Sequence, residues 1–271
     1  MKKQLAFFLK VSGLNRISGS FSKGKAKILL YHSVVKDIKF DPAIDPADQC
    51  LTKDEFESQL VYIKKNFNII SLDDLLLAGI YKKSVSAVIT FDDGFLNNFT
   101  VAYPLLKKHG LPATFFITTS FLSGEAPLSH ITAKENEFFR PMHWDHVISM
   151  SKDPLVTIGS HARHHVPLTK IPEKKLYEEV LLSKRTLEEK TGKVVKYISY
   201  PRGAFNDTVR GAVERAGYKG ALTTIHGFND SRTDPFALKR NSIGNRGDLA
   251  ILDCIVSGTW DLFTKRGYTR I

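Results

Sequence analysis

The chain has 271 residues, of which 42% are apolar, so it can bury the core of one large α/β domain. Its only two cysteines, Cys50 and Cys254, exclude a disulfide-rich scaffold and favour free thiols in a reducing compartment. A net charge of +11 fits an anionic phospholipid surface or a phosphate-bearing glycan carrier, whereas no motif indicates nucleic acid, so no nucleic-acid partner is expected.

Residues 1–26 are predicted to form a basic amphipathic segment. Phe7, Val11 and Leu14 recur at helical spacing, but Lys10 interrupts the apolar run, which is too short for a signal peptide or a membrane span. Such a helix either lies on an anionic membrane surface or caps the domain through the same apolar face. The expected location is therefore cytoplasmic, with peripheral contact to the inner face of the membrane in the first case.

From residue 27 onward, segments typical of strands alternate with segments typical of helices. The predicted strands cover residues 27–32, 85–91, 113–118, 155–159, 194–200 and 221–224. The predicted helices start at the capping boxes 52–55 and 71–74 or cover residues 103–106, 144–150, 172–190 and 206–216, and a loop is expected at 122–141. This alternation predicts a parallel sheet or barrel, and the lack of a glycine-rich loop after the first strand disfavours a dinucleotide site.

Two pairs of potentially catalytic residues follow the ends of predicted strands. Asp92 and Asp93 come directly after one strand, and His161 and His165, which are expected to lie one helical turn apart, come after another. In a βα barrel these strand ends form a single face. One carboxylate and two imidazoles can hold a metal ion while the second carboxylate accepts a proton from water. The alternatives are an Asx turn and ordinary surface histidines, which the presence of both pairs disfavours.

Three segments resemble the motifs of the polysaccharide deacetylases, the NodB-homology group of carbohydrate esterase family 4. Residues 90–94 match the first motif, residues 159–168 resemble the second, and residues 199–203 resemble the third in its exopolysaccharide and biofilm-glycan form. The likeness covers about residues 27–245, and residues 246–271 are expected to form a helical extension. The resemblance implies a distorted (β/α)7-type barrel and metal-dependent removal of an N- or O-acetyl group from a sugar.

The resemblance also implies a role for each matching residue. Asp93, His161 and His165 would bind one divalent ion, with Zn²⁺ favoured and Co²⁺, Ni²⁺ or Mn²⁺ able to use the same ligands. Asp92 would be the general base, and the backbone N–H of Arg202 would help to hold the oxyanion. Four further residues are expected at the substrate: Tyr200, Pro201, His226 and Arg240. His164 is left out of the ligand set, because on a helix it would point about 100° away from His165.

Three positions depart from the family pattern. The better-known members have an Arg that tunes the base where Ser199 stands, and a Leu-x-His motif where this chain has Arg240, which is a poor proton donor. Ala162 replaces a Ser or Thr, which is expected to remove a supporting hydrogen bond. His32 at the end of the first strand is expected to take over as general acid, with His226 the weaker candidate and a structural role the alternative for each.

Three functions fit these residues. The first is a deacetylase acting on an acetylated glycan or a lipid-linked saccharide. The second is a glycan-binding or scaffold subunit that has lost its chemistry, which the missing Arg and His motivate but the four retained site residues oppose. The third is a deformylase or amidase acting on a lipid-linked sugar or a small molecule. Metal content separates the second from the others, and a panel of acetyl and formyl substrates separates the first from the third.

Overall fold

The computed structural model describes residues 24–36, 50–76, 85–128, 139–243 and 248–262. Most of the predicted amphipathic segment, residues 1–23, lies outside the described residues, as do residues 246–247 and 263–271 of the predicted extension. Among the helices that are described, none has the length and apolar character needed to cross a membrane.

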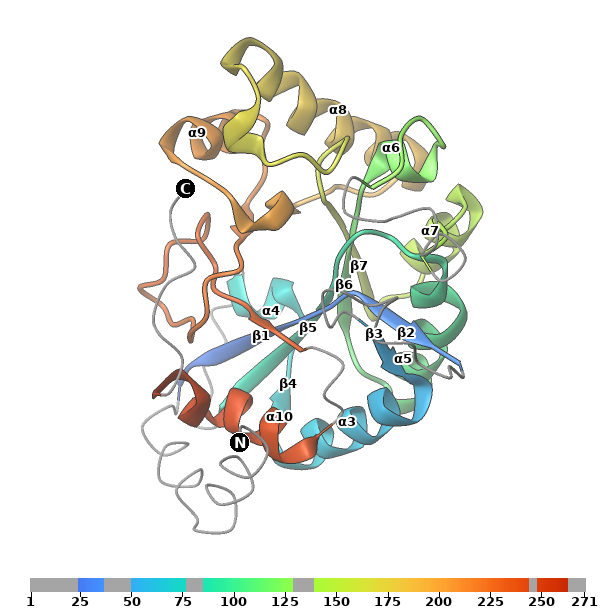
Figure 1. Cartoon of the computed structure of the whole chain (residues 1–271), viewed down its shortest axis with the longest axis vertical. Coiled ribbons are helices and arrows are strands. Elements are labelled where there is room, and N and C mark those ends of the chain that lie inside the picture. The colour runs from blue at the N-terminus through green and yellow to red at the C-terminus, as the bar shows by residue number, and fades with distance from the viewer. Residues whose placement is uncertain (1–23, 37–49, 77–84, 129–138, 244–247, 263–271) are drawn as a thin grey trace.

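A parallel sheet forms the centre of the molecule (Figure 1). Its strand order is β10-β1-β5-β6-β7-β8-β9, with β4 also paired to β5. The strand bounds are β1 Ala26–Tyr31, β4 Asn68–Ile69, β5 Ser86–Phe91, β6 Ala113–Ile117, β7 Val156–Ser160, β8 Tyr197–Ser199, β9 Gly220–Leu222 and β10 Asn241–Ser242. A separate pair is formed by β2 Ser33–Val35 and β3 Cys50–Thr52. The sheet curls into a half-barrel, which confirms the predicted α/β fold class.

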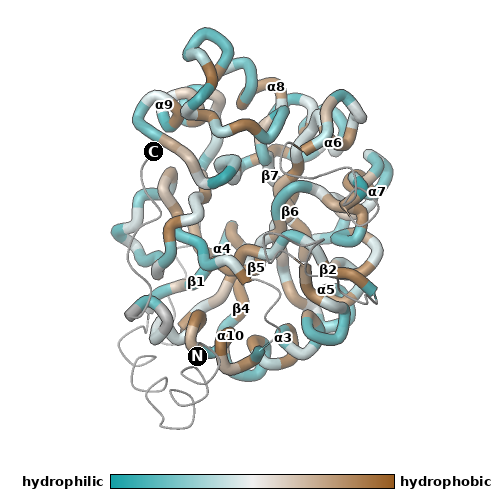
Figure 2. Tube along the Cα trace, in the orientation of Figure 1, coloured by the Kyte–Doolittle hydropathy of each residue, from teal (hydrophilic) through white to brown (hydrophobic). Residues whose placement is uncertain are grey.

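Helices surround the sheet (Figure 1). Hydrophilic and hydrophobic residues are mixed along most of these helices, whereas the strands are mainly hydrophobic (Figure 2). The helix bounds are α3 Lys53–Asn66, α4 Leu72–Leu76, α5 Tyr103–His109, α6 Thr119–Leu122, α7 Trp144–Ser151, α8 Glu173–Thr191, α9 Asp207–Arg215 and α10 Leu249–Ser257. Shorter turns are the π-helix η1 Asn98–Ala102 and the 3-10 helices η2 Leu168–Lys170, η3 Pro201–Gly203 and η4 Thr259–Leu262. The predicted capping box at Thr52 and Glu55 is present and starts α3.

Several elements differ from the sequence prediction, among them α6, β8 and η1. The helix α6, which was not expected from the sequence, ends at Leu122, where the predicted loop at 122–141 begins. Residues 129–138 of that loop lie outside the described part. The strand predicted at 194–200 is limited to β8, because Val194 is 73% exposed and its segment has no neighbouring strand. The π-helix η1 before α5 was not expected from the sequence.

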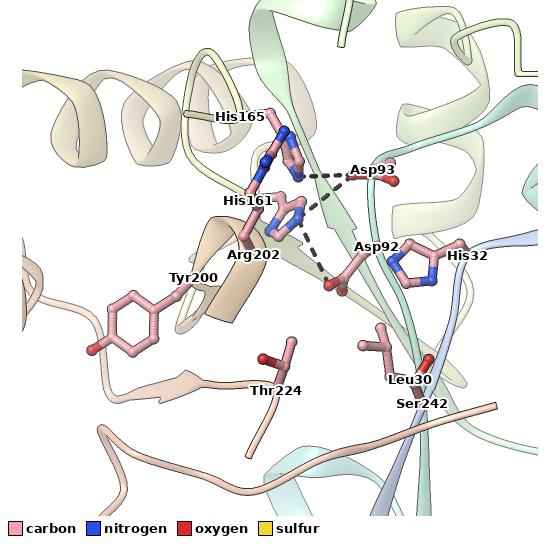
Figure 3. Close-up of a pocket in the computed structure, with 10 residues that line it drawn as sticks. All are labelled: Leu30, His32, Asp92, Asp93, His161, His165, Tyr200, Arg202, Thr224 and Ser242. Carbon is pink, nitrogen blue, oxygen red and sulfur yellow. Dashed lines mark ion pairs between the residues drawn. The ribbon is translucent and has the colours of Figure 1, made fainter. Parts of the chain in front are cut away.

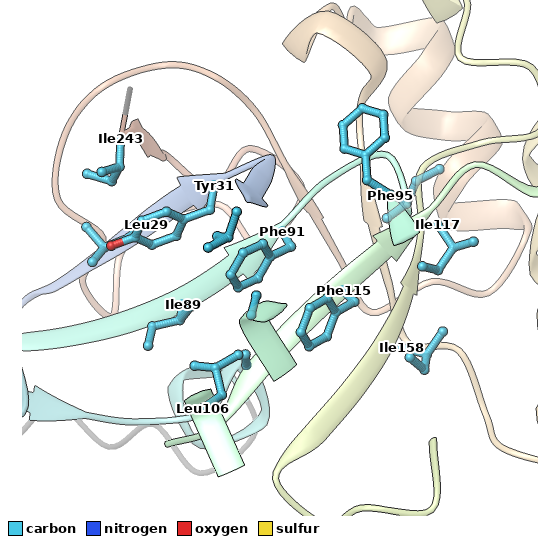
Figure 4. Packing of buried hydrophobic residues seen from close by; sticks show 14 of the residues in the cluster. Leu29, Tyr31, Ile89, Phe91, Phe95, Leu106, Phe115, Ile117, Ile158 and Ile243 are labelled. Atoms are coloured by element: carbon cyan, nitrogen blue, oxygen red, sulfur yellow. The ribbon is translucent and has the colours of Figure 1, made fainter. Parts of the chain in front are cut away.

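Aromatic side chains stack across the strands that lead to the predicted site (Figure 4). Tyr31, Phe91 and Phe115 lie on β1, β5 and β6, with ring centroids 5.4 Å apart for the first pair and 4.9 Å for the second. Phe56 of α3 packs edge-on against the first two rings. Such pairs add about 0.5–1.5 kcal/mol each beyond area burial. They fix the end of β5 directly before Asp92.

The segment predicted as a C-terminal extension is helical where it is described. The helix α10 lies beside α3 (Figure 1), and its buried face, including Ile251 and Leu252, belongs to the main hydrophobic core. The 3-10 helix η4 is tied to β1, because the buried Lys27 Nζ donates to Asp261 Oδ2 at 2.5 Å. These contacts join the C-terminal helices to the same core as the sheet.

Candidate metal site and catalytic pocket

The three predicted metal ligands come together beyond the carboxyl ends of β5 and β7 (Figure 3). His165 Nε2 lies 3.4 Å and His161 Nε2 3.6 Å from Asp93 Oδ1, and the three ligand atoms all lie within 4.8 Å of one another. A tetrahedral ion with bonds of about 2.1 Å places its ligand atoms about 3.4 Å apart. The observed separations therefore fit a single bound ion.

The hydrogen bonding of His161 orients it for metal binding. Its Nδ1 lies 2.8 Å from the carbonyl oxygen of Ser199, which can only accept a hydrogen bond. Nδ1 therefore carries the proton, and the lone pair of Nε2 faces Asp93. All three ligand side chains are buried. A buried set of two imidazoles and one carboxylate is a suitable site for a divalent cation.

The segment between the two histidines is a loop, so the expectation that they lie one helical turn apart is wrong. Ala162 and His165 have φ values of 61° and 52°, which break any helix. His164 still lies outside the ligand set, because its Nδ1 is 2.8 Å from Glu179 Oε2. The two ligands are thus brought together by a turn with left-handed residues at positions 162 and 165.

Asp92, the predicted base, is paired with Arg240. Arg240 donates from Nη1 to Asp92 Oδ1 and from Nη2 to Oδ2, both at 2.8 Å, and Ser199 Oγ donates to Oδ2 at 3.0 Å. Burial raises the pKa of the Asp92 carboxyl, whereas the charge and the hydrogen bonds of Arg240 lower it, and on balance this pKa lies below its ordinary value. Asp92 is therefore ionised at neutral pH and can accept a proton.

This arrangement corrects the expectation that Arg240 contacts the substrate. Its side chain is 1% exposed, and its three nitrogens donate to Asp92, to the Thr223 carbonyl oxygen and to Ser199 Oγ. Two departures from the family pattern are thereby linked. The guanidinium that is missing where Ser199 stands is supplied by Arg240, at the position where a His was expected. The sequence signal for this pairing was an Arg that is absent where Ser199 stands and present instead at the position of the expected His.

A pocket of about 380 Å³ opens in front of these residues, within the size range of small-molecule sites. It is lined by Leu30, His32, Asp92, Asp93, His161, His165, Tyr200, Arg202, Thr224 and Ser242 (Figure 3). Tyr200 is a fixed wall, because its ring stacks on Phe205 at 5.2 Å and its hydroxyl donates to the Phe236 carbonyl oxygen at 3.1 Å. Pro201 is buried and begins η3 without lining the pocket, so it shapes the site through the backbone.

Arg202 stands at the pocket with an unusual backbone. Its φ is 58°, inside the 3-10 turn η3. As the second residue of this turn, it has no carbonyl within the turn to bond its own N–H. The described non-glycine residues with positive φ are all at this site: Asp93, Ala162, His165 and Arg202. Unfavourable backbone conformations gathered in one place indicate a functional site.

The two candidate general acids lie in different places. His32 lines the pocket beside Asp92, as its position at the end of β1 predicted (Figure 3). His226 does not line the pocket, is exposed, and has Asp261 and Lys27 as its charged neighbours. The expectation that His226 contacts the substrate or donates the proton is thus at odds with its position, and His32 is the only one of the two at the site.

Comparison with known proteins points to the family whose motifs the three segments resemble. The family model described as "Polysaccharide deacetylase" matches residues 81–221, a segment that contains Asp92, Asp93, His161 and His165. A Bacillus subtilis protein named as a polysaccharide deacetylase, YxkH, is 29% identical over 220 residues, covering 80% of this chain and 70% of its own length. The poly-β-1,6-N-acetyl-D-glucosamine N-deacetylase of Staphylococcus aureus is 27% identical over 221 residues, covering 73% and 72%.

Two solved structures illustrate the shared fold. The deacetylase PplD of Streptococcus pyogenes, in complex with acetate, superposes with a TM-score of 0.72 at 22% identity, covering 85% of this chain and 98% of its own. IcaB from Ammonifex degensii superposes with a TM-score of 0.70 at 20% identity, covering 86% and 97%. At these identities the likeness establishes a shared fold.

Proposed function

The chain belongs to the polysaccharide deacetylase family, and we propose that it hydrolyses the acetyl amide of an N-acetylated sugar in a glycan or a lipid-linked saccharide. The observation that carries the proposal is a carboxylate, Asp92, held ionised by Arg240 directly beside the Asp93–His161–His165 group. Amide hydrolysis by a metal-dependent enzyme needs both parts, a base for water and a cation site next to it.

Six residues of the pocket have a role in this reaction, three as metal ligands and three in the transfer of protons and the stabilisation of charge. Asp93, His161 and His165 would hold a divalent ion, for which Zn²⁺ is the best match, and that ion would supply Lewis-acid polarisation of the acetyl carbonyl and a lowered pKa of water. Asp92 accepts the proton of the attacking water. The Arg202 N–H donates to the oxygen of the acetyl carbonyl as negative charge develops there. His32 then passes a proton to the departing sugar nitrogen, which leaves as an amine.

The choice of an N-acetyl substrate rests on the relatives and on the pocket. The Staphylococcus aureus relative is named for N-deacetylation of poly-β-1,6-N-acetyl-D-glucosamine. The pocket of about 380 Å³ can admit one acetylated sugar residue with its metal-facing acetamide. An amide also needs a proton on its leaving nitrogen, and His32 is placed to provide it. An O-acetyl ester would depend less on such a donor.

The proposal extends to location. Residues 1–26 carry the predicted basic amphipathic pattern, and the net charge of +11 favours anionic surfaces. We propose a cytoplasmic protein that contacts the inner membrane face peripherally, near a lipid-linked saccharide. Co-sedimentation with vesicles of phosphatidylglycerol should show salt-sensitive binding, and binding that is unchanged after removal of residues 1–23 would contradict a role for this segment.

The scaffold alternative loses its main support in the structure. It was motivated by an Arg and a His missing from the family pattern, but Arg240 supplies the missing guanidinium to Asp92 and His32 places an imidazole in the pocket. The deformylase or amidase alternative keeps the same site and differs only in the group removed. Measurements with different substrates, and not the geometry of the site, therefore distinguish this alternative from a deacetylase.

The experiment measures metal content and product release together. Protein purified without a His tag should hold close to one equivalent of divalent metal by elemental analysis. It should release acetate and free amine from N-acetylglucosamine oligomers faster than formate from N-formyl or acetate from O-acetyl analogues. His161→Ala and His165→Ala should lose the metal, whereas His143→Ala, at an exposed position outside the pocket, should keep it. Parent-like metal content in both ligand variants would refute the site.

A further inference from the structure

We propose that Glu179 of α8 is a positioning residue that fixes the loop carrying both histidine ligands and thereby sets the affinity of the metal site. The inference rests on the metal site of the proposed function. It assigns a task to a residue outside every recognised motif, 14 positions beyond His165. Glu179 touches neither the pocket nor the three ligand atoms, so it acts only through the loop.

The Glu179 carboxylate takes hydrogen bonds from the middle of the loop. Its Oε1 accepts the backbone N–H of Arg163 at 3.0 Å and that of His164 at 2.6 Å, and its Oε2 lies 2.8 Å from His164 Nδ1. Glu179 is only 8% exposed, so these bonds are shielded from competing water. Bonds from backbone N–H groups to a charged acceptor are among the strong hydrogen bonds of proteins.

The loop needs such support because its own conformation is unfavourable. Ala162 and His165 both adopt positive φ, a region that costs about 1–2 kcal/mol for residues with a side chain. Ala162 also lacks the hydroxyl that the family resemblance leads one to expect beside the first histidine. A loop of this shape persists only where the surrounding structure holds it. The backbone N–H groups of Arg163 and His164 both donate to Glu179, while the carbonyl oxygen of Arg163 accepts from Ser120 of α6.

A second contact from the same helix holds the start of the loop. Ser160 Oγ accepts the N–H of Ala162 at 3.1 Å and lies 2.8 Å from Ser183 Oγ. Glu179 and Ser183 are four residues apart on α8, so both face the loop from one side of the helix. The helix α8 thus provides, by two side chains one turn apart, the support that a hydroxyl at residue 162 would otherwise give.

Metal affinity measured on the metal-free protein is the direct test, because it does not depend on turnover. Outer residues that orient metal ligands typically change affinity by about 10- to 100-fold when removed. Titration of the metal-free protein with Co²⁺, followed by its visible absorption, should give a dissociation constant about 10- to 100-fold weaker for Glu179→Ala than for the parent. Glu179→Gln keeps an Oε1 acceptor for both N–H groups and should restore binding to within about threefold.

A matched control lies on the same helix. Glu188 Oε1 also accepts a backbone N–H, that of Val195 at 3.0 Å, but at the far end of α8 from the loop. Glu188→Ala should lower the melting temperature while leaving the Co²⁺ dissociation constant unchanged. If Glu179→Ala fails to fold, Glu179→Asp keeps the charge but withdraws the carboxylate by about 1.5 Å, and should weaken binding similarly.

The outcomes separate this inference from the proposed function. Parent-like Co²⁺ affinity in Glu179→Ala or Glu179→Asp would overturn the inference and leave the metal site standing. An equal loss of affinity in Glu188→Ala would also overturn it, because the effect would then reflect general destabilisation. A parent protein that binds no Co²⁺ would instead refute the proposed metal-dependent function itself.

Discussion

Arg240 and Asp92 are 148 residues apart in the sequence and share two hydrogen bonds of 2.8 Å in the interior of the protein. The planar guanidinium matches the carboxylate bidentately, which a lysine could not do. Both side chains are almost fully buried, so neither charge can be satisfied by solvent if the other is removed. The pair therefore controls both the proton affinity of the base and the stability of the fold around it.

Replacing Arg240 should shift the pH dependence of the reaction. Burial raises the pKa of Asp92, but this pKa lies below its ordinary value, with the charge and the hydrogen bonds of Arg240 among the causes. In Arg240→Gln the burial remains and one cation is lost, so this pKa rises and the base becomes protonated at higher pH. The acid limb of the kcat/KM profile should move to higher pH in Arg240→Gln. An acid limb at the same pH as the parent would show that Arg240 does not tune the base.

Asp92→Asn should abolish turnover and also destabilise the protein. The amide cannot accept the proton of water, which costs about 10²- to 10⁴-fold in kcat. It also leaves the buried Arg240 without its counter-ion, a change that removes up to about 3–5 kcal/mol of stability. Metal content should be retained. Thermal unfolding of the double variant Asp92→Asn/Arg240→Met should recover part of the lost stability, and no recovery would contradict a coupled pair.

His32→Gln should change the alkaline side of the rate profile. Burial lowers the pKa of His32 more than the carboxylates of Asp93 and Asp92 raise it, and the charge of Arg240 lowers it further. A proton donor with a lowered pKa loses its proton below the ordinary 6.5, so kcat should fall as pH rises through that lower value. His32→Gln should reduce kcat about 10²-fold and remove this limb while keeping the metal. If the alkaline limb persists in His32→Gln, His32 is not the proton donor, and Asp92 would return its proton to the leaving nitrogen instead.

Gly203→Ala should damage the pocket without touching its catalytic groups. Gly203 has φ of 70°, and a Cβ there would lie 2.1 Å from Thr224 Oγ1 and 2.7 Å from the Thr224 backbone nitrogen. Because Thr224 lines the pocket, its displacement should lower kcat/KM by about 10- to 100-fold. Gly110→Ala is the control, since Gly110 has a similar φ of 65° with nothing within 4 Å of the added Cβ. Equal losses in both variants would implicate backbone strain alone.

The metal ligands could be predicted from the sequence because each lies in a short local pattern. Asp93 follows a recognisable strand, and His161 and His165 share one motif. The role of Arg240 could not be predicted from the sequence. It depends on the pairing of β10 with β1 and of β1 with β5, which brings distant segments of the chain side by side. The turn at 162–165 was misjudged for the same reason, since its shape depends on hydrogen bonds to α8 and not on helical propensity.

The pairing of the first strand of the sheet with its last has a consequence for how activity is lost. β10 contributes only two residues beside β1, yet it follows Arg240 directly and places Ser242 in the pocket. Short segments with few ladder bonds open locally at a lower free energy than the whole domain. Separation of β10 from β1 would move the Arg240 guanidinium away from Asp92 while β5, β6 and β7 stay paired. In urea, activity should therefore be lost before the far-ultraviolet circular dichroism signal. Amide protons where β1 pairs with β10 should be the first of the sheet to exchange with solvent.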